Sequence, residues 1–297
     1  MPRVAITADL HHDVARSRDA AEAALRRLRE SDADALLLVG DTATADGDAL
    51  ERALSHLPND GRPRLFVPGN HELWSKQRKV PASELLAEKL PRRLRDLGFH
   101  WLPGDPFCFE DGTAIVGTLG WYDHAFALPE LKLPARFYDS GLAPGVAAWL
   151  GRLDLDPTAE DVPPRMLKFF ARWNDKRFIS GLASDAAFAV EELSQFSRDL
   201  DAVADATSVL AAVHVVPAAE LLPPVPPGPI PPKGLKYAFV RAYLGSPSFG
   251  AAALARPNVS HLVCGHSHFR RAATIGAVRC LNVGSTYVEK HVDVISV

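Results

Sequence analysis

The side chains with the clearest chemical potential in this sequence are carboxylates, imidazoles and one amide that occur in five short blocks. In chain order, the blocks read Asp-Leu-His, Gly-Asp, Gly-Asn-His-Glu, a single His within an apolar run, and Gly-His-Ser-His. Divalent cations that act on phosphate take oxygen and imidazole ligands, and a pair of them needs a carboxylate that can bridge. The set therefore predicts a two-metal centre that acts on a phosphate group. Its members are Asp9, His11, Asp41, Asn70, His71, His214, His266 and His268.

The elements that must position these side chains are short apolar runs that precede or contain each block. We expect strands at residues 4–8, 35–39, 65–67, 209–216 and 259–264, and helices at residues 13–30 and 48–57. Open α/β sheets place their ligand sites beyond the carboxyl ends of their strands. A folded sheet would therefore gather the five blocks at one edge.

Each block also has a purely structural interpretation when it is taken alone. Asp9, Asp41 and Asn70 could cap helices that follow strands, because their side chains satisfy free backbone amides there. His214 could be a hydrogen-bonded core histidine, since it lies inside an apolar run. The order of all five blocks favours the metal centre, because a two-metal site uses all of these residue types together.

In this order the blocks resemble the signature of the calcineurin-like metallophosphoesterase family, which is Asp-x-His, Gly-Asp, Gly-Asn-His-Asp/Glu, a lone His and Gly-His-x-His. The resemblance spans residues 9–268 and implies a metal-dependent phosphoesterase with two divalent ions. Manganese is the first expectation for the ions, with iron, zinc, nickel and cobalt as alternatives. The ligands that the resemblance implies are Asp9, His11 and His268 for the first ion, Asn70, His214 and His266 for the second, and Asp41 as the bridge.

The resemblance gives His71 the role of catalytic residue rather than metal ligand. His71 would stabilise the charged phosphoryl group or protonate the leaving oxygen, while a hydroxide shared by the two ions attacks phosphorus. The sequence departs from the family at Thr44, where many members have an aspartate that orients this histidine. Asp46 or Glu72 could take over that task, and the sequence does not choose between them.

The resemblance implies an α/β fold in which two mixed β-sheets pack as a sandwich flanked by helices. The length of 297 residues fits one domain over residues 1–297 better than two independent domains. A helical insertion over residues 121–205 is a candidate cap, and a proline-rich loop over residues 217–234 is expected at the surface. Within the insertion we expect an apolar helix face of Val190, Leu193, Leu200 and Val203, with Glu191, Glu192, Arg198 and Asp199 facing solvent.

The insertion is rich in aromatic and basic side chains that could face a substrate. Amphipathic helices need aromatic residues for their own packing, so we expect most of these aromatics to form a local core. We also hypothesise that the insertion narrows access to the centre and sets specificity. The side chains concerned are Trp121, Tyr122, His124, Phe126, Phe137, Tyr138, Lys168, Arg172, Lys176 and Arg177.

Composition limits the classes of partner. The net charge of -3 and the isoelectric point near 6.4 do not favour a nucleic-acid partner. No run of roughly twenty uninterrupted apolar residues is present, so no membrane partner is expected. The three cysteines show no paired spacing and residues 1–9 do not resemble a signal peptide, which together predict a cytoplasmic protein.

The substrate is expected to be a small-molecule phosphate ester, with nucleotides among the candidates. Phosphomonoesters, cyclic or linear diesters, nucleic-acid ends and phospholipid precursors all remain open, as does the oligomeric state. A rival hypothesis from a different class is a non-catalytic scaffold that keeps this fold to bind a protein partner. Such a scaffold could lose His71 or metal ligands freely, whereas all of them are present here.

Overall fold

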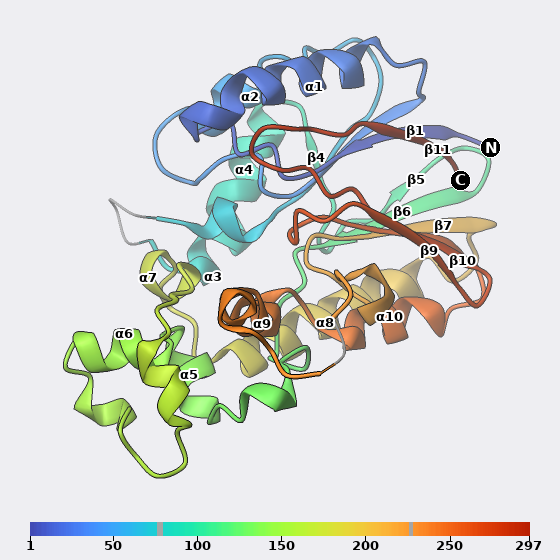
Figure 1. Cartoon of the computed structure of the whole chain (residues 1–297). Helices are drawn as coiled ribbons and strands as arrows, with labels where there is room; N and C mark the ends of the chain where they lie inside the picture. The colour runs from blue at the N-terminus through green and yellow to red at the C-terminus, as the bar shows by residue number, and fades with distance from the viewer. Residues whose placement is uncertain (76–79, 226–227) are drawn as a thin grey trace.

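Two mixed β-sheets form the centre of the computed structural model, which describes residues 1–75, 80–225 and 228–297. Helices cover the outer faces of both sheets (Figure 1). The predicted sandwich is confirmed. In spatial order, the first sheet contains β11 (Asp293–Ser296), β1 (Arg3–Thr7), β2 (Ala35–Val39), β3 (Arg64–Val67) and β4 (His100–Trp101). The second contains β5 (Phe107–Cys108), β6 (Thr113–Thr118), β7 (Ser208–Val213), β8 (Val259–Cys264), β10 (Val278–Asn282) and β9 (Arg271–Ile275).

In the described parts of the chain, one α-helix follows each of β1 and β2, two follow each of β3 and β7, and a group of four lies between β6 and β7. The α-helices are α1 (Arg18–Glu30), α2 (Ala49–Leu54), α3 (Ala82–Glu84), α4 (Leu90–Asp96), α5 (Ala135–Ser140), α6 (Pro144–Trp149), α7 (Asp175–Phe178), α8 (Asp185–Ala202), α9 (Leu235–Val240) and α10 (Pro247–Leu254). Short 3-10 turns lie at Ala15–Ser17, Asn70–Leu73, Pro129–Leu131, Leu153–Leu155, Pro164–Lys168, Ala219–Leu221, Pro232–Gly234 and Arg241–Tyr243, with one π-turn at Leu85–Lys89.

The strands that precede the functional blocks run in the same direction within each sheet. In the first sheet, β1, β2 and β3 pair in parallel. In the second sheet, β7 pairs in parallel with β6 and with β8. Parallel strands deliver their carboxyl ends to one edge of a sheet. This direction of pairing brings the five loops together.

Three layers of apolar packing hold the sandwich together. Between the sheets, Ile6, Leu37, Leu65, Leu210 and Val263 belong to one buried cluster. The outer face of the first sheet packs on α1 and α2, and the outer face of the second packs on α8 and α10 (Figure 1). Each fully buried side chain of this size contributes roughly 1.5–3 kcal/mol to folding.

The residues of the expected insertion form four α-helices, α5 to α8. The aromatic side chains of Trp121, Tyr122, Phe137 and Tyr138 are buried and belong to the cluster that also contains α1 and α2. The last helix of the group, α8, packs on β6 and α10 and therefore covers the second sheet. The aromatic residues of this segment thus serve mainly as core.

The expected apolar face of α8 is wrong in two respects. Val190 is 65% exposed, and the carboxylates of Glu192 and Asp199 face the protein instead of solvent. Glu192 accepts a hydrogen bond from the Thr118 hydroxyl at 2.9 Å, and Asp199 accepts one from the Gly104 amide at 2.8 Å. These partners offset part of the cost of burying the two carboxylates, so Glu192 and Asp199 face the protein although hydropathy predicts that they face solvent.

The proline-rich segment includes residues 226–227, which lie outside the described residues. Its described part contains 3-10 turns at Ala219–Leu221 and Pro232–Gly234. Leu221 and Leu222 are buried against the second sheet's outer cluster, whereas Pro231 and Pro232 are exposed. The segment is therefore anchored at its beginning.

Two further expectations bear on the setting of the protein. Cys108, Cys264 and Cys280 are all free, and the last two are buried. Among the described residues, no helix combines the length and the apolar character needed to span a membrane.

We expect Glu192→Gln to raise the free energy of unfolding at high pH. Burial raises the pKa of the Glu192 carboxyl from 4.5 to about 7. The protonated form therefore favours folding, so the carboxyl's contribution is fully present below pH 4.5 and is lost as the pH rises through about 7. In urea unfolding, the variant should match the wild type near pH 4.5 and exceed it by on the order of 1–3 kcal/mol at pH 8.

The matched control is Glu191→Gln, because Glu191 is an exposed neighbour on the same helix. That variant should show no such dependence on pH. A Glu192→Gln effect of equal size at pH 4.5 and pH 8 would contradict the assignment of the raised pKa to this carboxyl.

Candidate metal centre

The predicted site residues lie in five loops that directly follow β1, β2, β3, β7 and β8. Backbone hydrogen bonds join the loops, from the Asp9 amide to the Gly40 carbonyl at 3.0 Å and from the His11 amide to the Asp41 carbonyl at 2.8 Å. Five of the residues have a positive φ, which is a strained backbone conformation for residues other than glycine: Asp9 (57°), His11 (45°), Asp41 (54°), His266 (67°) and His268 (55°). Strained backbone of this kind clusters at functional sites, where the surrounding structure holds it in place.

One cluster of ligand atoms brings together Asp9, His11 and His268, all within 4.8 Å of one another. The Nε2 atoms of His11 and His268 face each other at 3.1 Å. Burial and the neighbouring His71 hold the pKa of His11 well below its usual value, so its imidazole is neutral and can offer a lone pair. Burial raises the pKa of Asp9, and attraction to His268 and His214 offsets this effect only in part.

A second cluster contains Asp41, His214 and His266, again within 4.8 Å. Hydrogen bonds orient both imidazoles: His214 Nδ1 lies 3.0 Å from the Val39 carbonyl, and His266 Nε2 lies 3.0 Å from the Tyr243 carbonyl. Each ring therefore keeps its other nitrogen as a possible ligand atom, which is how outer partners orient metal-binding histidines. Burial and His214 lower the pKa of His266 to about 3.

Asp41 belongs to the second cluster and also lies close to His11 of the first. Its Oδ2 is 3.7 Å from His11 Nε2, and its Oδ1 is 3.3 Å from His214 Nε2. Burial would raise the pKa of this carboxyl, but the attraction of His71 and His214 outweighs burial and keeps the pKa well below its usual range. In turn, the attraction of Asp41 outweighs burial at His214 and raises the pKa of this histidine to about 9. Asp41 is therefore an anion with one oxygen directed to each cluster.

Asn70 completes the second cluster with its amide oxygen, which lies 3.2 Å from His214 Nε2. Its amide nitrogen donates to Asp175 Oδ1 at 2.9 Å. This hydrogen bond sets the orientation of the amide group, so that the oxygen is the atom that faces His214.

His71 lies at the first cluster and is buried. Its ring stacks on Trp74 with centroids 3.7 Å apart and meets His11 edge to face at 4.4 Å. Its Nε2 is 3.9 Å from Asp41 Oδ2, and its Nδ1 has no hydrogen-bond partner among the described residues. Burial lowers the pKa of His71. Aromatic packing, together with the hydrogen bond from its backbone amide to Asp41 Oδ1 at 2.9 Å, holds this residue in place.

Glu72 has a different task from the one that the sequence left open. Its carboxylate accepts hydrogen bonds from the backbone amides of Gly69, Asp41, Thr42 and Ala43 at 2.6 to 3.0 Å. Burial and repulsion from Asp41 raise the pKa of Glu72 to about 8, but four amide donors require an acceptor on both oxygens and favour the carboxylate. Glu72 thus joins the loops after β2 and β3 and does not orient the His71 ring.

Asp46, the other candidate for orienting His71, lines a separate hollow with Ser75 and Lys89. It does not line the pocket that contains His71.

Asp175, from α7, is a site residue that the sequence analysis missed. It is buried and accepts hydrogen bonds from Asn70, from the indole nitrogens of Trp74 (2.6 Å) and Trp173 (3.0 Å), and from the Tyr122 hydroxyl (3.2 Å). Burial raises its pKa to about 6. No local pattern marks Asp175, because it is 105 positions from Asn70 and none of the five blocks includes it.

The carboxyl-terminal segment contributes two more residues without a sequence signal. Tyr287 stacks on His11 with centroids 4.7 Å apart, and the Arg16 guanidinium lies over the Tyr287 ring. The buried Lys290 donates to the Asp9 carbonyl. Burial lowers the pKa of this lysine to about 8.

Glycines at the loop bends allow the ligand atoms to approach. A Cβ on Gly40 would lie 2.2 Å from the His214 ring, and one on Gly69 would lie 2.3 Å from Asp41 Oδ1. At Gly265 it would lie 2.7 Å from Asp9 Oδ2. Side chains at these positions would therefore displace the candidate ligands.

The donor set fits divalent cations. Asp9 Oδ2 and the Nδ1 atoms of His11 and His71 are buried without a hydrogen-bond partner in the described part of the chain. Facing imidazole nitrogens and an unpaired carboxylate oxygen are costly without a cation between them. Carboxylate, amide oxygen and imidazole together suit first-row transition metals.

A pocket of about 470 Å³ opens over the centre. Of the four basic residues expected near the substrate, Arg172 lines this pocket, whereas Lys176 pairs with Asp185 at 2.6 Å and Arg177 lies over the Phe178 ring. Lys168 does not line it. The other lining residues that are not candidate ligands include Trp173, Asn174, Lys236 and Tyr287.

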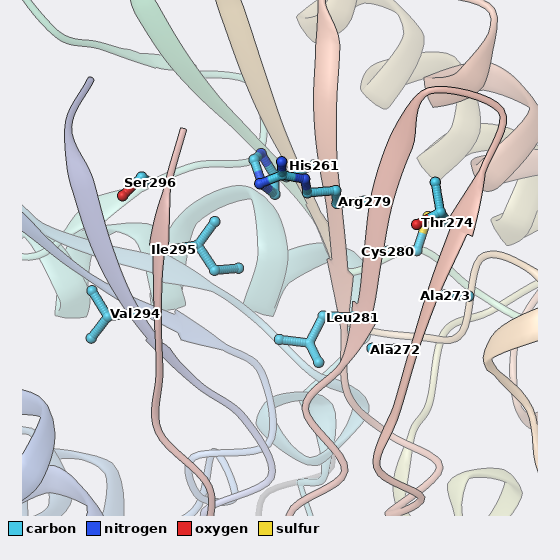
Figure 2. Close-up of a pocket in the computed structure, with 10 residues that line it drawn as sticks. All are labelled: His261, Ala272, Ala273, Thr274, Arg279, Cys280, Leu281, Val294, Ile295 and Ser296. Atoms are coloured by element: carbon cyan, nitrogen blue, oxygen red, sulfur yellow. The ribbon is translucent and has the colours of Figure 1, made fainter.

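A hollow of about 590 Å³ lies elsewhere, beside edge strand β11 and across β8, β9 and β10 (Figure 2). It is lined by small and apolar side chains with His261 and Arg279, and no carboxylate lines it. It lacks a cluster of metal ligands among the described residues. The chemistry therefore belongs to the smaller pocket.

We expect Asp175→Ala to weaken binding of metal to the centre by about 10–100-fold, as losses of outer partners do in other metal sites. The variant frees the Asn70 amide to rotate, while Asp175→Asn keeps one acceptor and should have a smaller effect. Metal titration after chelator treatment measures the change.

The control is Asp185→Ala, which removes a buried carboxylate that pairs with Lys176 and His124 and contacts none of the candidate ligands. Equal metal affinity in the Asp175→Ala and Asp185→Ala proteins would contradict a specific role for Asp175.

Comparison with known proteins is consistent with this geometry. The model of the calcineurin-like phosphoesterase family matches residues 2–178, and a search of curated proteins found no match. The crystal structure of phosphopantetheinyl hydrolase from Mycobacterium tuberculosis is similar, with a TM-score of 0.68 and 19% identity over 97% of this chain and 90% of that chain. A dimetal phosphatase from Danio rerio has a TM-score of 0.53 and 13% identity, over 97% of this chain and 89% of that chain.

At these identities the solved structures show a common fold, whereas the family match covers more than half of the chain. The chain therefore belongs to the calcineurin-like phosphoesterase family, whose members are metal-dependent hydrolases of phosphate esters.

Proposed function

We propose that this protein hydrolyses a small-molecule phosphate ester with water activated between two divalent ions. The observation that carries the proposal is the position of Asp41, whose two carboxylate oxygens are directed to different clusters of ligands. Two ions held there would lower the pKa of a shared water from about 15.7 toward neutrality and neutralise charge on the phosphate.

The proposed ligands are those that the family resemblance implies. Asp9, His11 and His268 would hold one ion, Asn70, His214 and His266 would hold the other, and Asp41 would serve both. Manganese is the first choice, and iron, zinc, nickel and cobalt suit the same ligand types.

His71 is the proposed catalytic residue. Its ring is held by Trp74 and lines the pocket beside Asp41. Because burial lowers its pKa, the resting ring is neutral and can donate one N–H to the phosphoryl oxygen. Delivery of a proton to the leaving oxygen would require prior protonation of the ring, for which the negative charge of Asp41 is favourable.

The proposed substrate is small and carries a second anionic group. Arg172 and Lys236 are both exposed, line the mouth of the pocket, and have no carboxylate partner among the described residues. A nucleotide has a suitable distribution of charge, and Trp173 offers an aromatic surface beside it. The neighbour named phosphopantetheinyl hydrolase adds compounds with a phosphopantetheinyl group to the candidates.

Three further proposals concern the partner, the location and a rival function. A nucleic-acid substrate is not favoured by the net charge of -3. A cytoplasmic location is proposed because Cys108, Cys264 and Cys280 are free, as cysteines usually are in a reducing compartment. The rival function is a scaffold that binds a protein partner without catalysis.

The first experiment compares hydrolysis of a chromogenic phosphomonoester with that of the matching phosphodiester by chelator-treated protein. Activity that returns with manganese supports the proposed mechanism, and the preferred ester identifies the substrate class.

We expect His71→Asn to lower kcat by about 10²–10⁴-fold, with metal content unchanged, because His71 is not a proposed ligand.

The control for this change is His100→Asn on β4, which lies outside the pocket and should leave the rate unchanged. A protein that binds no metal when untreated, and whose biological function survives Asp41→Ala, would overturn the enzymatic proposal in favour of the scaffold.

We expect Arg172→Ala to act on specificity. It should raise KM by roughly 10-fold for esters that carry a second phosphate or carboxylate, since a charge-assisted hydrogen bond contributes about 1.5–3 kcal/mol. For a neutral aryl phosphate, KM should change little. Arg177→Ala is the matched control, because Arg177 packs over Phe178. An equal effect of Arg172→Ala on both kinds of ester would contradict the second anionic group.

A further inference from the structure

A separate cluster of metal-ligand side chains lies on the helical side of the first sheet. It consists of His12 from the loop after β1, Glu22 from α1, and His56, which follows α2. One ligand atom from each residue lies within 4.8 Å of the other two. Among the described residues, it is the one such cluster that shares no member with the proposed two-ion centre.

The distances are close to those between ligands of a single ion, although one of them is also a long hydrogen bond. Glu22 Oε1 is 3.3 Å from His12 Nε2 and 3.8 Å from His56 Nε2. Ligand atoms at about 2.0–2.2 Å from a tetrahedral zinc ion are themselves about 3.3–3.6 Å apart, whereas N–H···O hydrogen bonds are commonest near 2.9 Å. One carboxylate oxygen thus lies between two imidazoles at nearly the spacing of ligands.

The three residues differ in freedom in a way that suits binding of an ion. His12 is buried, and its backbone amide donates to the Thr42 carbonyl at 2.9 Å, so this ligand is already in place. The side chains of Glu22 and His56 are 34% and 39% exposed. They can therefore close by a few tenths of an ångström, and water can reach a fourth position. Two histidines, one glutamate and a water form a known ligand set for zinc.

We propose that His12, Glu22 and His56 bind a further divalent ion of zinc-like chemistry, separate from the two-ion centre. This ion joins α1 and the end of α2 to the loop that carries His11. The backbone amides of His11 and His12 both donate hydrogen bonds to the loop after β2. The ion therefore stabilises the two loops that carry His11 and Asp41, without contacting substrate.

The test is equilibrium dialysis of chelator-treated protein against Zn²⁺, with metal counted per chain. We expect His56→Ala and Glu22→Gln each to bind one equivalent fewer than the wild type. His100→Ala removes a histidine from β4 outside the cluster and should bind as many as the wild type. The result is a difference between proteins with the same two-ion centre, so it does not depend on how many ions that centre holds.

Two further readouts separate this proposal from the proposed function. Hydrolysis with manganese should be unchanged in His56→Ala, and added Zn²⁺ should raise Tm less in this variant than in the wild type, because binding to the folded state stabilises it. Equal zinc stoichiometry in the wild type, His56→Ala and Glu22→Gln would overturn the proposal, whatever the activity.

Discussion

The site of this protein depends on a buried anion, the Asp41 carboxylate, and on the backbone that holds it. Asp41 has a φ of 54° and is almost inaccessible to solvent. A carboxylate in such a position is stable only if cations or strong donors surround it. Three imidazoles within 4 Å supply part of this environment, and bound metal ions would supply the rest. The backbone conformation of Asp41 therefore serves the proposed chemistry, because it holds the carboxylate among these groups.

Glu72 shows how the fold supports that backbone. Its carboxylate accepts hydrogen bonds from backbone amides in the loop after β2, which contains Asp41, and from the Gly69 amide in the loop after β3. A single side chain thus joins the ends of β2 and β3. A hydrogen bond from an amide to a charged acceptor contributes about 1.5–3 kcal/mol, so four of them can hold strained residues in place. The residue after the proposed catalytic histidine is thus a structural support of the site, and His71 is positioned by Trp74 and by its own backbone amide.

The insertion is tied to the centre by hydrogen bonds as well as by its position at the pocket. Asp175 of α7 orients the Asn70 amide and also binds Trp74, Trp173 and Tyr122. The same short segment brings Arg172 and Trp173 to the pocket mouth. One region therefore contributes both to the proposed metal ligation and to the proposed recognition of substrate. Substitutions in this region would therefore affect both metal binding and substrate recognition.

By itself, the sequence predicted the family from the order of its five blocks, and that resemblance in turn implied the sandwich fold; both predictions are confirmed. Apolar runs predicted β2 and β8 at their observed bounds and placed the loops that carry Asp9, Asp41 and His266 at one edge. Only the tertiary structure decided the function of Glu72, the approach of Asp175 to Asn70, and the orientation of Glu192 and Val190 on α8. These features depend on partners far away in the chain, such as Gly69 and Asp41 for Glu72 and Thr118 for Glu192. Hydropathy and motif spacing describe neighbours in sequence, whereas a buried carboxylate is stabilised by whichever donors the fold brings to it.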